Sequence, residues 1–117
     1  MSPAPSHPVL DRNLRAALVL LQRLQERGLR HLVLAPGSRS APLAVAAGLL
    51  EQGGRLLLHP CLDERSGAFL ALGLARAEGL PAAVVTTSGS AVANLLPAAV
   101  EADHGTLPLL LLSADRP

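Results

Sequence analysis

Residues 31–40 read HLVLAPGSRS, and this stretch sets the pattern of the whole chain. A short apolar run from His31 to Ala35 is broken by Pro36 and Gly37, and Ser40 can then cap a helix that runs to about Gln52. A strand that is apolar at every position is typical of a parallel sheet covered on both faces. We therefore predict a strand, a tight turn and a helix in this order.

The same alternation extends on both sides of this stretch. Upstream, the three-and-four spacing of leucines and alanines predicts a helix from Asp11, which can cap its start, to Gly28, which can end it. Downstream, we predict strands at 55–58, 82–86 and 107–113 and helices at 64–78 and 90–101.

Strands that alternate with helices, joined by right-handed crossovers, predict one architecture. We expect an α/β fold in three layers, with a mainly parallel, doubly wound sheet of the Rossmann-like or flavodoxin-like type. It would contain about four strands and four helices. Open sheets of this class usually continue further, so we expect a truncated domain. Residues 1–10 are predicted to form a flexible N-terminal tail and residues 11–117 the folded domain.

Composition excludes several classes of protein. Of the 117 residues half are apolar and 16% are charged, with a net charge of +1, which excludes disorder and a polybasic surface for nucleic acid. Phe69 is the only aromatic side chain of the Phe, Tyr and Trp types, so bases have no platform to stack on. The lone Cys61 excludes an internal disulfide and favours a cytoplasmic protein. The longest uncharged stretch, 79–100, carries prolines and a run of hydroxyl residues, so no membrane span is expected.

Polar residues gather in the four loops that follow the predicted strands, where ligands bind in sheets of this class. In the first loop, Gly37 allows close approach of the backbone, and Ser38 and Arg39 offer a hydroxyl group and a planar guanidinium group to a carboxylate or phosphate. A tight turn with a solvated arginine is an equally good interpretation of this segment alone.

The second loop leads into a helix that opens with Asp63, Glu64 and Arg65. Acidic residues in a first turn usually only oppose the helix dipole. Here, however, residues 66–75 carry no charge, so we expect this helix to be buried on most of its circumference and to need a partner surface. Glu64 is therefore a candidate catalytic residue, and glutamate at Ala68 or Ala71 is expected to weaken self-association.

The third loop, residues 86–90, is rich in hydroxyl groups and could bind a phosphate or a polar cofactor, or simply cap a helix. It matches neither a G-x-S-x-G elbow nor a G-x-G-x-x-G fingerprint. His59, Cys61 and Asp63 alternate, but with no second cluster of ligands a metal site is not predicted. Cys61 lies beside two acids, which predicts a normal or raised thiol pKa and an unreactive thiol.

Taken together, four segments resemble one enzyme family in order and spacing: 35–43, 63–65, 87–98 and 113–117. They look like the N-terminal pyrimidine-binding domain of the thiamine-diphosphate enzymes called 2-succinyl-5-enolpyruvyl-6-hydroxy-3-cyclohexene-1-carboxylate synthases (MenD), and the resemblance covers about residues 11–117. Two positions depart from the family pattern, at Cys61-Leu62 and at Ser90.

The resemblance implies a transferase of menaquinone and phylloquinone biosynthesis that decarboxylates 2-oxoglutarate and adds the succinyl carbanion to isochorismate. It implies that Glu64 activates the cofactor by hydrogen-bonding the aminopyrimidine ring. It further implies that Ser38, Arg39 and Arg116 contact substrate and that Thr87, Ser88 and Gly89 border the cofactor. The full enzyme would be a homodimer or homotetramer.

No Gly-Asp-Gly segment followed by Asn occurs in this sequence, so the resemblance implies that Mg2+ or Mn2+ is held by a C-terminal domain and that this chain alone is inactive. Two other functions stay open at this point. One is another thiamine-diphosphate 2-oxo-acid decarboxylase or acetolactate-synthase relative, and the other is a noncatalytic anion-binding α/β module.

Overall fold

The computed structural model describes residues 8–115. A four-stranded sheet in the order β2-β1-β3-β4 lies at its centre, and every neighbouring pair of strands is parallel. Along the chain the elements are α1 (Pro8–Glu26), β1 (His31–Leu34), the 3-10 helix η1 (Ser38–Ser40), α2 (Ala41–Gln52), β2 (Leu57–Pro60), α3 (Glu64–Glu78), β3 (Ala82–Thr86), α4 (Ser90–Ala93), α5 (Leu96–Gly105) and β4 (Leu109–Ser113).

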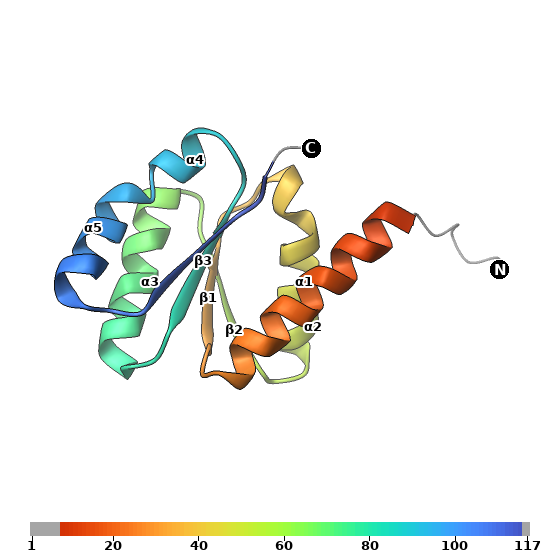
Figure 1. The fold of residues 1–117 in the computed structure, drawn as a ribbon, viewed down its shortest axis with the longest axis horizontal. Helices are drawn as coiled ribbons and strands as arrows, with labels where there is room; N and C mark the ends of the chain where they lie inside the picture. The colour runs from red at the N-terminus through yellow and green to blue at the C-terminus, as the bar shows by residue number, and fades with distance from the viewer. Residues whose placement is uncertain (1–7, 116–117) are drawn as a thin grey trace.

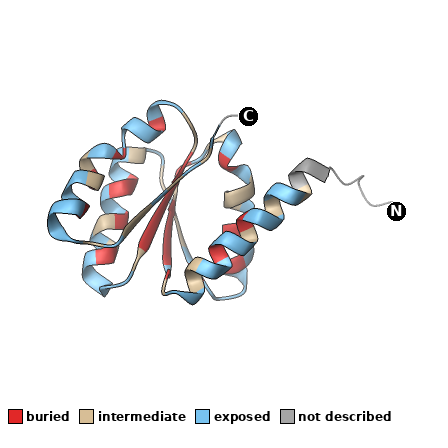
Figure 2. Ribbon diagram, in the orientation of Figure 1, coloured by how far each residue is buried: buried red, intermediate tan, exposed pale blue. Residues whose placement is uncertain are grey.

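Helices cover both faces of this sheet (Figure 1). Helices α1 and α2 pack on one face around Leu21, Leu32 and Leu50, while α3 and α5 pack on the other around Val33, Ala71 and Leu95. The two central strands are buried along most of their length, and the helices are buried on the sides that face the sheet and exposed on their outer sides (Figure 2). The predicted three-layer, doubly wound α/β fold is confirmed.

Several predicted boundaries are wrong. Helix α1 begins at Pro8, so residues 8–10 are helical rather than part of a tail, and Asp11 lies inside the first turn. Strands β2 and β4 each begin two residues later than predicted, at Leu57 and Leu109. The single helix predicted at 90–101 is two helices, α4 and α5. Proline explains this break, because Pro97 has no N–H to donate and its ring would clash with the carbonyl group of Ala93 in a continuous helix.

Helix α3 corrects the expectation of a helix buried on most of its circumference. Ala68 and Ala71 are fully buried, but they pack in the core of this same chain. A glutamate at either position would bury an unpaired charge and unfold the domain instead of weakening association. The exposed apolar side chains of this helix are Phe69, at 39%, and Leu70, at 45%.

Two histidine side chains connect β1 and β2 to the end of α3 through hydrogen bonds. The Nε2 atom of His31, a buried residue, donates a hydrogen bond of 2.9 Å to Oε1 of Glu78. This leaves Nδ1 of a singly protonated His31 ring to accept from Nε2 of His59, also at 2.9 Å. Arg30 lies 3.6 Å from the second oxygen of Glu78. The network links the outer strand to the helix that covers the neighbouring strand.

Burial lowers the pKa of His59, and the nearby His31 lowers it further, while the carboxylate of Glu51 opposes both effects. The hydrogen bond from His31 likewise lowers the pKa of Glu78. Because the folded chain binds a proton at His59 more weakly than the unfolded chain, the stability that neutral His59 contributes is complete above its ordinary pKa of 6.5. It is lost as the pH falls below that value, and the contribution of Glu78 is lost below its own ordinary pKa of 4.5.

We therefore expect the melting temperature of the chain to fall between about pH 7.5 and about pH 5.5. His59→Gln should flatten this dependence, because glutamine cannot be protonated in that range. Thermal unfolding followed by circular dichroism at a series of pH values measures the effect. His104→Gln, at an exposed position in α5, is the matched control and should leave the slope unchanged. Equal slopes for the wild-type chain and His59→Gln would contradict the assignment.

Candidate active site

The loops that follow the four strands meet at one edge of the sheet, as parallel strands require. Backbone hydrogen bonds extend the strand pairing into these loops. The N–H of Ala35 donates to the carbonyl of Val85 at 3.0 Å, and that of Cys61 donates to Leu34 at 2.9 Å. At the fourth strand the N–H of Ala114 donates to the carbonyl of Thr86 at 2.9 Å. The predicted site residues from different loops are therefore held on a common, ordered edge.

The first and third loops touch at Gly37 and Thr87. A Cβ atom built on Gly37 would lie 2.4 Å from the Cβ atom of Thr87, which is far inside van der Waals contact. The backbone of Gly37 is extended, with φ of 176°, so glycine is needed here for its missing side chain and not for an unusual conformation. This contact brings Ser38 and Arg39 beside the hydroxyl-rich turn.

After Gly37 the chain makes one turn of 3-10 helix before α2 begins. Ser40 is buried, and its hydroxyl group donates a hydrogen bond of 3.0 Å to the carbonyl of Gly37. Ser38 and Arg39 are exposed. Arg39 forms no ion pair within residues 8–115, so its guanidinium group is available to an anion.

At the start of α3 two neighbouring acids have different roles. Asp63 caps the helix, because its Oδ2 atom accepts from the backbone N–H of Ser66 at 3.0 Å and from the Ser66 hydroxyl at 2.7 Å. These two bonds lower the pKa of Asp63. Glu64 is half-buried and its carboxyl group has no hydrogen-bond or ion-pair partner among the residues that the structure describes. Glu64 is the acid left free for chemistry.

Cys61 lies behind these acids and packs on the helix. A Cβ atom on Gly67 would meet its Sγ atom at 2.5 Å, so a larger residue at that position of α3 would have to displace the Cys61 side chain. Burial raises the pKa of the Cys61 thiol, and the charges of Glu64 and Asp63 raise it further. The predicted raised thiol pKa is confirmed.

In the turn after β3, Thr87 and Ser88 are half-buried, while Gly89 is exposed and has φ of +83°, a conformation that favours glycine. Thr86, just before the turn, is fully buried and its hydroxyl group donates to the Ser113 hydroxyl at 3.4 Å. Sequence reasoning assigned no role to this link between β3 and β4. This hydrogen bond joins the last residues of β3 and β4, directly before the turn.

The structure places the predicted residues at one edge but on different faces. Arg39 lies on the side covered by α1, since it lines a cavity together with residues of that helix. Glu64 begins α3, which covers the opposite face. Arg116, predicted to contact substrate, lies outside the described residues.

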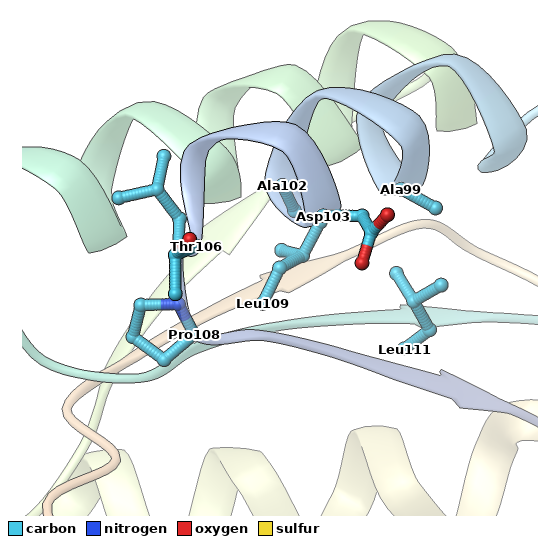
Figure 3. Close-up of a pocket in the computed structure, with 8 residues that line it drawn as sticks. Ala99, Ala102, Asp103, Thr106, Pro108, Leu109 and Leu111 are labelled. Carbon is cyan, nitrogen blue, oxygen red and sulfur yellow. The ribbon is translucent and has the colours of Figure 1, made fainter.

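A cavity of about 620 Å3 lies elsewhere and contains none of the predicted site residues. It runs between α5 and the outermost strand β4, with Asp103 above and Leu109 and Leu111 below (Figure 3). Asp103 is its only ionisable side chain, which makes it a poor candidate for catalysis. Across residues 8–115 no three histidine, cysteine, aspartate or glutamate side chains lie close enough to bind a metal ion. None of the helices in this part of the chain combines the length and apolar character needed to cross a bilayer.

The chain matches a known family of domains. Residues 14–117 match the family model of the thiamine pyrophosphate enzymes, N-terminal TPP binding domain. The chain belongs to this family. Most of the folded chain is covered by the match, including every predicted site residue.

Relatives of this TPP binding domain include proteins named 2-succinyl-5-enolpyruvyl-6-hydroxy-3-cyclohexene-1-carboxylate synthase. The chain is 67% identical over 98 residues to the one from Synechococcus sp. (strain WH7803), a match that covers 84% of this chain and 17% of that protein. It is 65% identical over 101 residues to the one from Kineococcus radiotolerans, covering 86% of this chain and 18% of that protein. The chain thus spans less than a fifth of the length of these relatives, and the predicted resemblance to the synthases is confirmed.

Among solved structures, the TPP binding domain is similar to benzoylformate decarboxylase from Polynucleobacter necessarius. The TM-score is 0.69 and the sequences are 21% identical, with 89% of this chain and 18% of that chain covered. At this identity the likeness shows the shared fold alone.

We expect Gly37→Ala to destabilise the domain, because the new methyl group would overlap Thr87 and push the two loops apart. Overpacking of this kind costs about 1–3 kcal/mol. Gly48→Ala is the matched control: nothing lies within 4 Å of its added Cβ atom, and it sits inside α2, so this change should be neutral or stabilising. Urea unfolding of both variants makes the comparison, and equal midpoints would show that the Gly37 contact does not constrain the loops.

Proposed function

We propose that this chain is the pyrimidine-binding part of a 2-succinyl-5-enolpyruvyl-6-hydroxy-3-cyclohexene-1-carboxylate synthase. The whole enzyme would be a cytoplasmic transferase of menaquinone and phylloquinone biosynthesis. The observation that carries the proposal is the partner-free carboxyl group of Glu64 at the head of α3, in a chain that is 62–70% identical to proteins of that name.

The residues of this edge suit the aminopyrimidine half of thiamine diphosphate. A carboxyl group with no competing partner can share a proton with a ring nitrogen, and Asp63 is less suited to this because its Oδ2 atom accepts two capping hydrogen bonds. Thr87, Ser88 and Gly89 present hydroxyl and backbone groups at the neighbouring strand end. Glu64 supplies a single carboxylate, and no cluster of three histidine, cysteine, aspartate or glutamate side chains occurs within residues 8–115, so we assign Mg2+ or Mn2+ and the diphosphate to a part of the enzyme outside this chain.

When bound, thiamine diphosphate supplies the electron sink that decarboxylation of a 2-oxo acid requires. In this proposal Glu64 holds the proton at the pyrimidine nitrogen, which sets the protonation state of the ring. Ser38 and Arg39, both exposed beside the turn, bind substrate carboxylate through the hydroxyl and guanidinium groups. Arg116 adds a second cation. Two arginines suit the two substrates, 2-oxoglutarate and isochorismate, because each carries two carboxylates.

The experiment is a substrate comparison with the full-length enzyme that contains this domain. It should consume 2-oxoglutarate and isochorismate together, in the presence of thiamine diphosphate and Mg2+. Turnover of pyruvate or benzoylformate instead would favour the alternative of another 2-oxo-acid decarboxylase or acetolactate-synthase relative. Binding of anions without turnover of any 2-oxo acid would favour a noncatalytic module.

We expect Glu64→Gln in the full-length enzyme to lower the rate by about 100- to 10,000-fold, because one positioned proton-transfer group is lost. Exchange of the thiazolium C2 proton, followed by NMR, should slow in parallel.

The matched control is Asp63→Asn, since asparagine still accepts the capping hydrogen bonds and should keep both the rate and the fold. Proton exchange at the wild-type rate in Glu64→Gln would refute the role of Glu64.

We also propose that the full-length enzyme is a homodimer or homotetramer in which a second copy covers the outer side of α3. Phe69 and Leu70 stand on that side with about two-fifths of their surface exposed, next to an uncharged stretch of helix. A carboxyl group at the head of this helix would then face the boundary between two chains.

Leu70→Glu should weaken this association while the subunit stays folded, because the side chain points away from the core of its own domain. Sedimentation of the full-length enzyme should show a shift toward monomers. Leu80→Glu, a similarly exposed leucine in the turn after α3, is the control and should not change the mass. Unchanged oligomers in Leu70→Glu would remove α3 from the interface.

A further inference from the structure

A cavity of about 300 Å3 lies next to Arg39, on the side of the sheet covered by α1. Arg39 and Asn13 are its two polar side chains, and its walls include Ala16, Leu20, Pro42 and Leu43. Asn13 comes from α1, and no motif in the sequence drew attention to it. The cavity therefore joins a predicted substrate-binding residue to a helix that the site has not so far included.

Asn13 reaches this place because of the direction of α1. The helix ends at Glu26 and a short turn leads from there into the start of β1, so α1 runs antiparallel to β1 and its beginning lies toward the strands' carboxyl ends. In Figure 1 its first turns project away from the sheet, to the right of α2. Asn13, in the second turn, is thereby placed beside the loop that follows β1, where Arg39 stands.

Both polar side chains are free to bind a ligand. Arg39 and Asn13 are exposed, and in the described part of the chain neither forms a side-chain hydrogen bond or an ion pair. A structural asparagine near a helix start normally caps backbone groups, but Asn13 lies inside α1 and caps nothing. The structure gives this carboxamide no internal role.

The chemistry of the cavity matches an aliphatic carboxylate. A guanidinium group binds a carboxylate through two parallel N–H···O bonds, and a carboxamide N–H can donate to the same group from another direction. The apolar walls suit the short methylene or ring carbon skeleton behind that carboxylate. A phosphate would fit less well, because a single arginine leaves most of its charge unpaired.

We propose that Asn13 is a further substrate-binding residue, which donates a hydrogen bond to the carboxylate that Arg39 binds. This inference rests on the proposed function for the identity of the substrate. Both proposed substrates carry carboxylates, so the cavity could bind a carboxylate group of either one. The experiment below shows whether 2-oxoglutarate or isochorismate supplies it.

Kinetics of the full-length enzyme provide the first test. Asn13→Ala should raise KM about 10-fold for whichever of 2-oxoglutarate and isochorismate occupies the cavity, as expected when one hydrogen bond to a charged group is lost. The KM for the other substrate and kcat should change little. Asn13→Asp should raise the same KM further, because its carboxylate would pair with Arg39 and repel the substrate.

Controls separate binding from structure. Gln22→Ala removes a similar exposed carboxamide from the same helix, outside the cavity, and should leave both KM values unchanged. Melting temperatures of all three variants should agree with the wild type, because none of these side chains packs in the core.

A second readout does not require synthase activity. Calorimetric titration with glutarate, a dicarboxylate without the reactive oxo group, should show weaker binding to Asn13→Ala and the weakest binding to Asn13→Asp. If the enzyme turned over neither proposed substrate but glutarate binding fell in this order, the proposed function would fail and the role of Asn13 would stand. If both variants kept the wild-type KM values and glutarate affinity, the role of Asn13 would be overturned whatever the enzyme's substrate.

Discussion

The contact between Gly37 and Thr87 constrains everything built on the carboxyl edge of this sheet. Strands β1 and β3 are neighbours, so the loops that leave them must either diverge or pack on each other. They pack, at a distance that leaves no room for a Cβ atom on Gly37. The 3-10 turn that carries Ser38 and Arg39 and the turn that carries Ser88 therefore form one continuous surface. Because closely packed groups have little room to move, the contact between Gly37 and Thr87 fixes the position of one loop relative to the other.

The second loop shows how one short segment serves both structure and chemistry. Asp63 gives its side chain to the helix start, where it accepts two hydrogen bonds from Ser66. Because Asp63 already caps the helix, Glu64 is not needed as a cap, and its carboxyl group stays available to a ligand. Cys61 and Gly67 pack tightly behind it and fix the angle at which α3 leaves the edge. A helix without its own cap would compete for the carboxylate that the proposed chemistry uses.

Much of this fold follows from local patterns. The bounds of α3 and β3 match the prediction to the residue, because a cap, a left-handed Gly79 and a continuous apolar run mark them plainly. The break between α4 and α5 also has a local cause, because Pro97 has no N–H to donate inside a continuous helix. The prediction that Ala68 and Ala71 contact a partner is wrong for another reason. Small residues in a helix indicate close packing, but they do not distinguish packing on the chain's own sheet from packing on a second chain. Asn13 could not be predicted as a site residue, since only the folded chain brings it to Arg39.

The division of the candidate residues between two faces limits how any ligand can use them. Arg39 lies on the face of the sheet that α1 covers, and Glu64 is the first residue of α3, which covers the opposite face. The turn at Thr87 follows β3, a central strand. A cofactor held at Glu64 and a substrate held at Arg39 must therefore meet over the ends of β1 and β3, along the surface that the Gly37 contact creates. The cavities at this edge, of about 220 and about 300 Å3, are small beside the one of about 620 Å3 between α5 and β4. Excluding water from the meeting point then requires a second surface facing this edge, which is the arrangement that the exposed apolar side of α3 also favours.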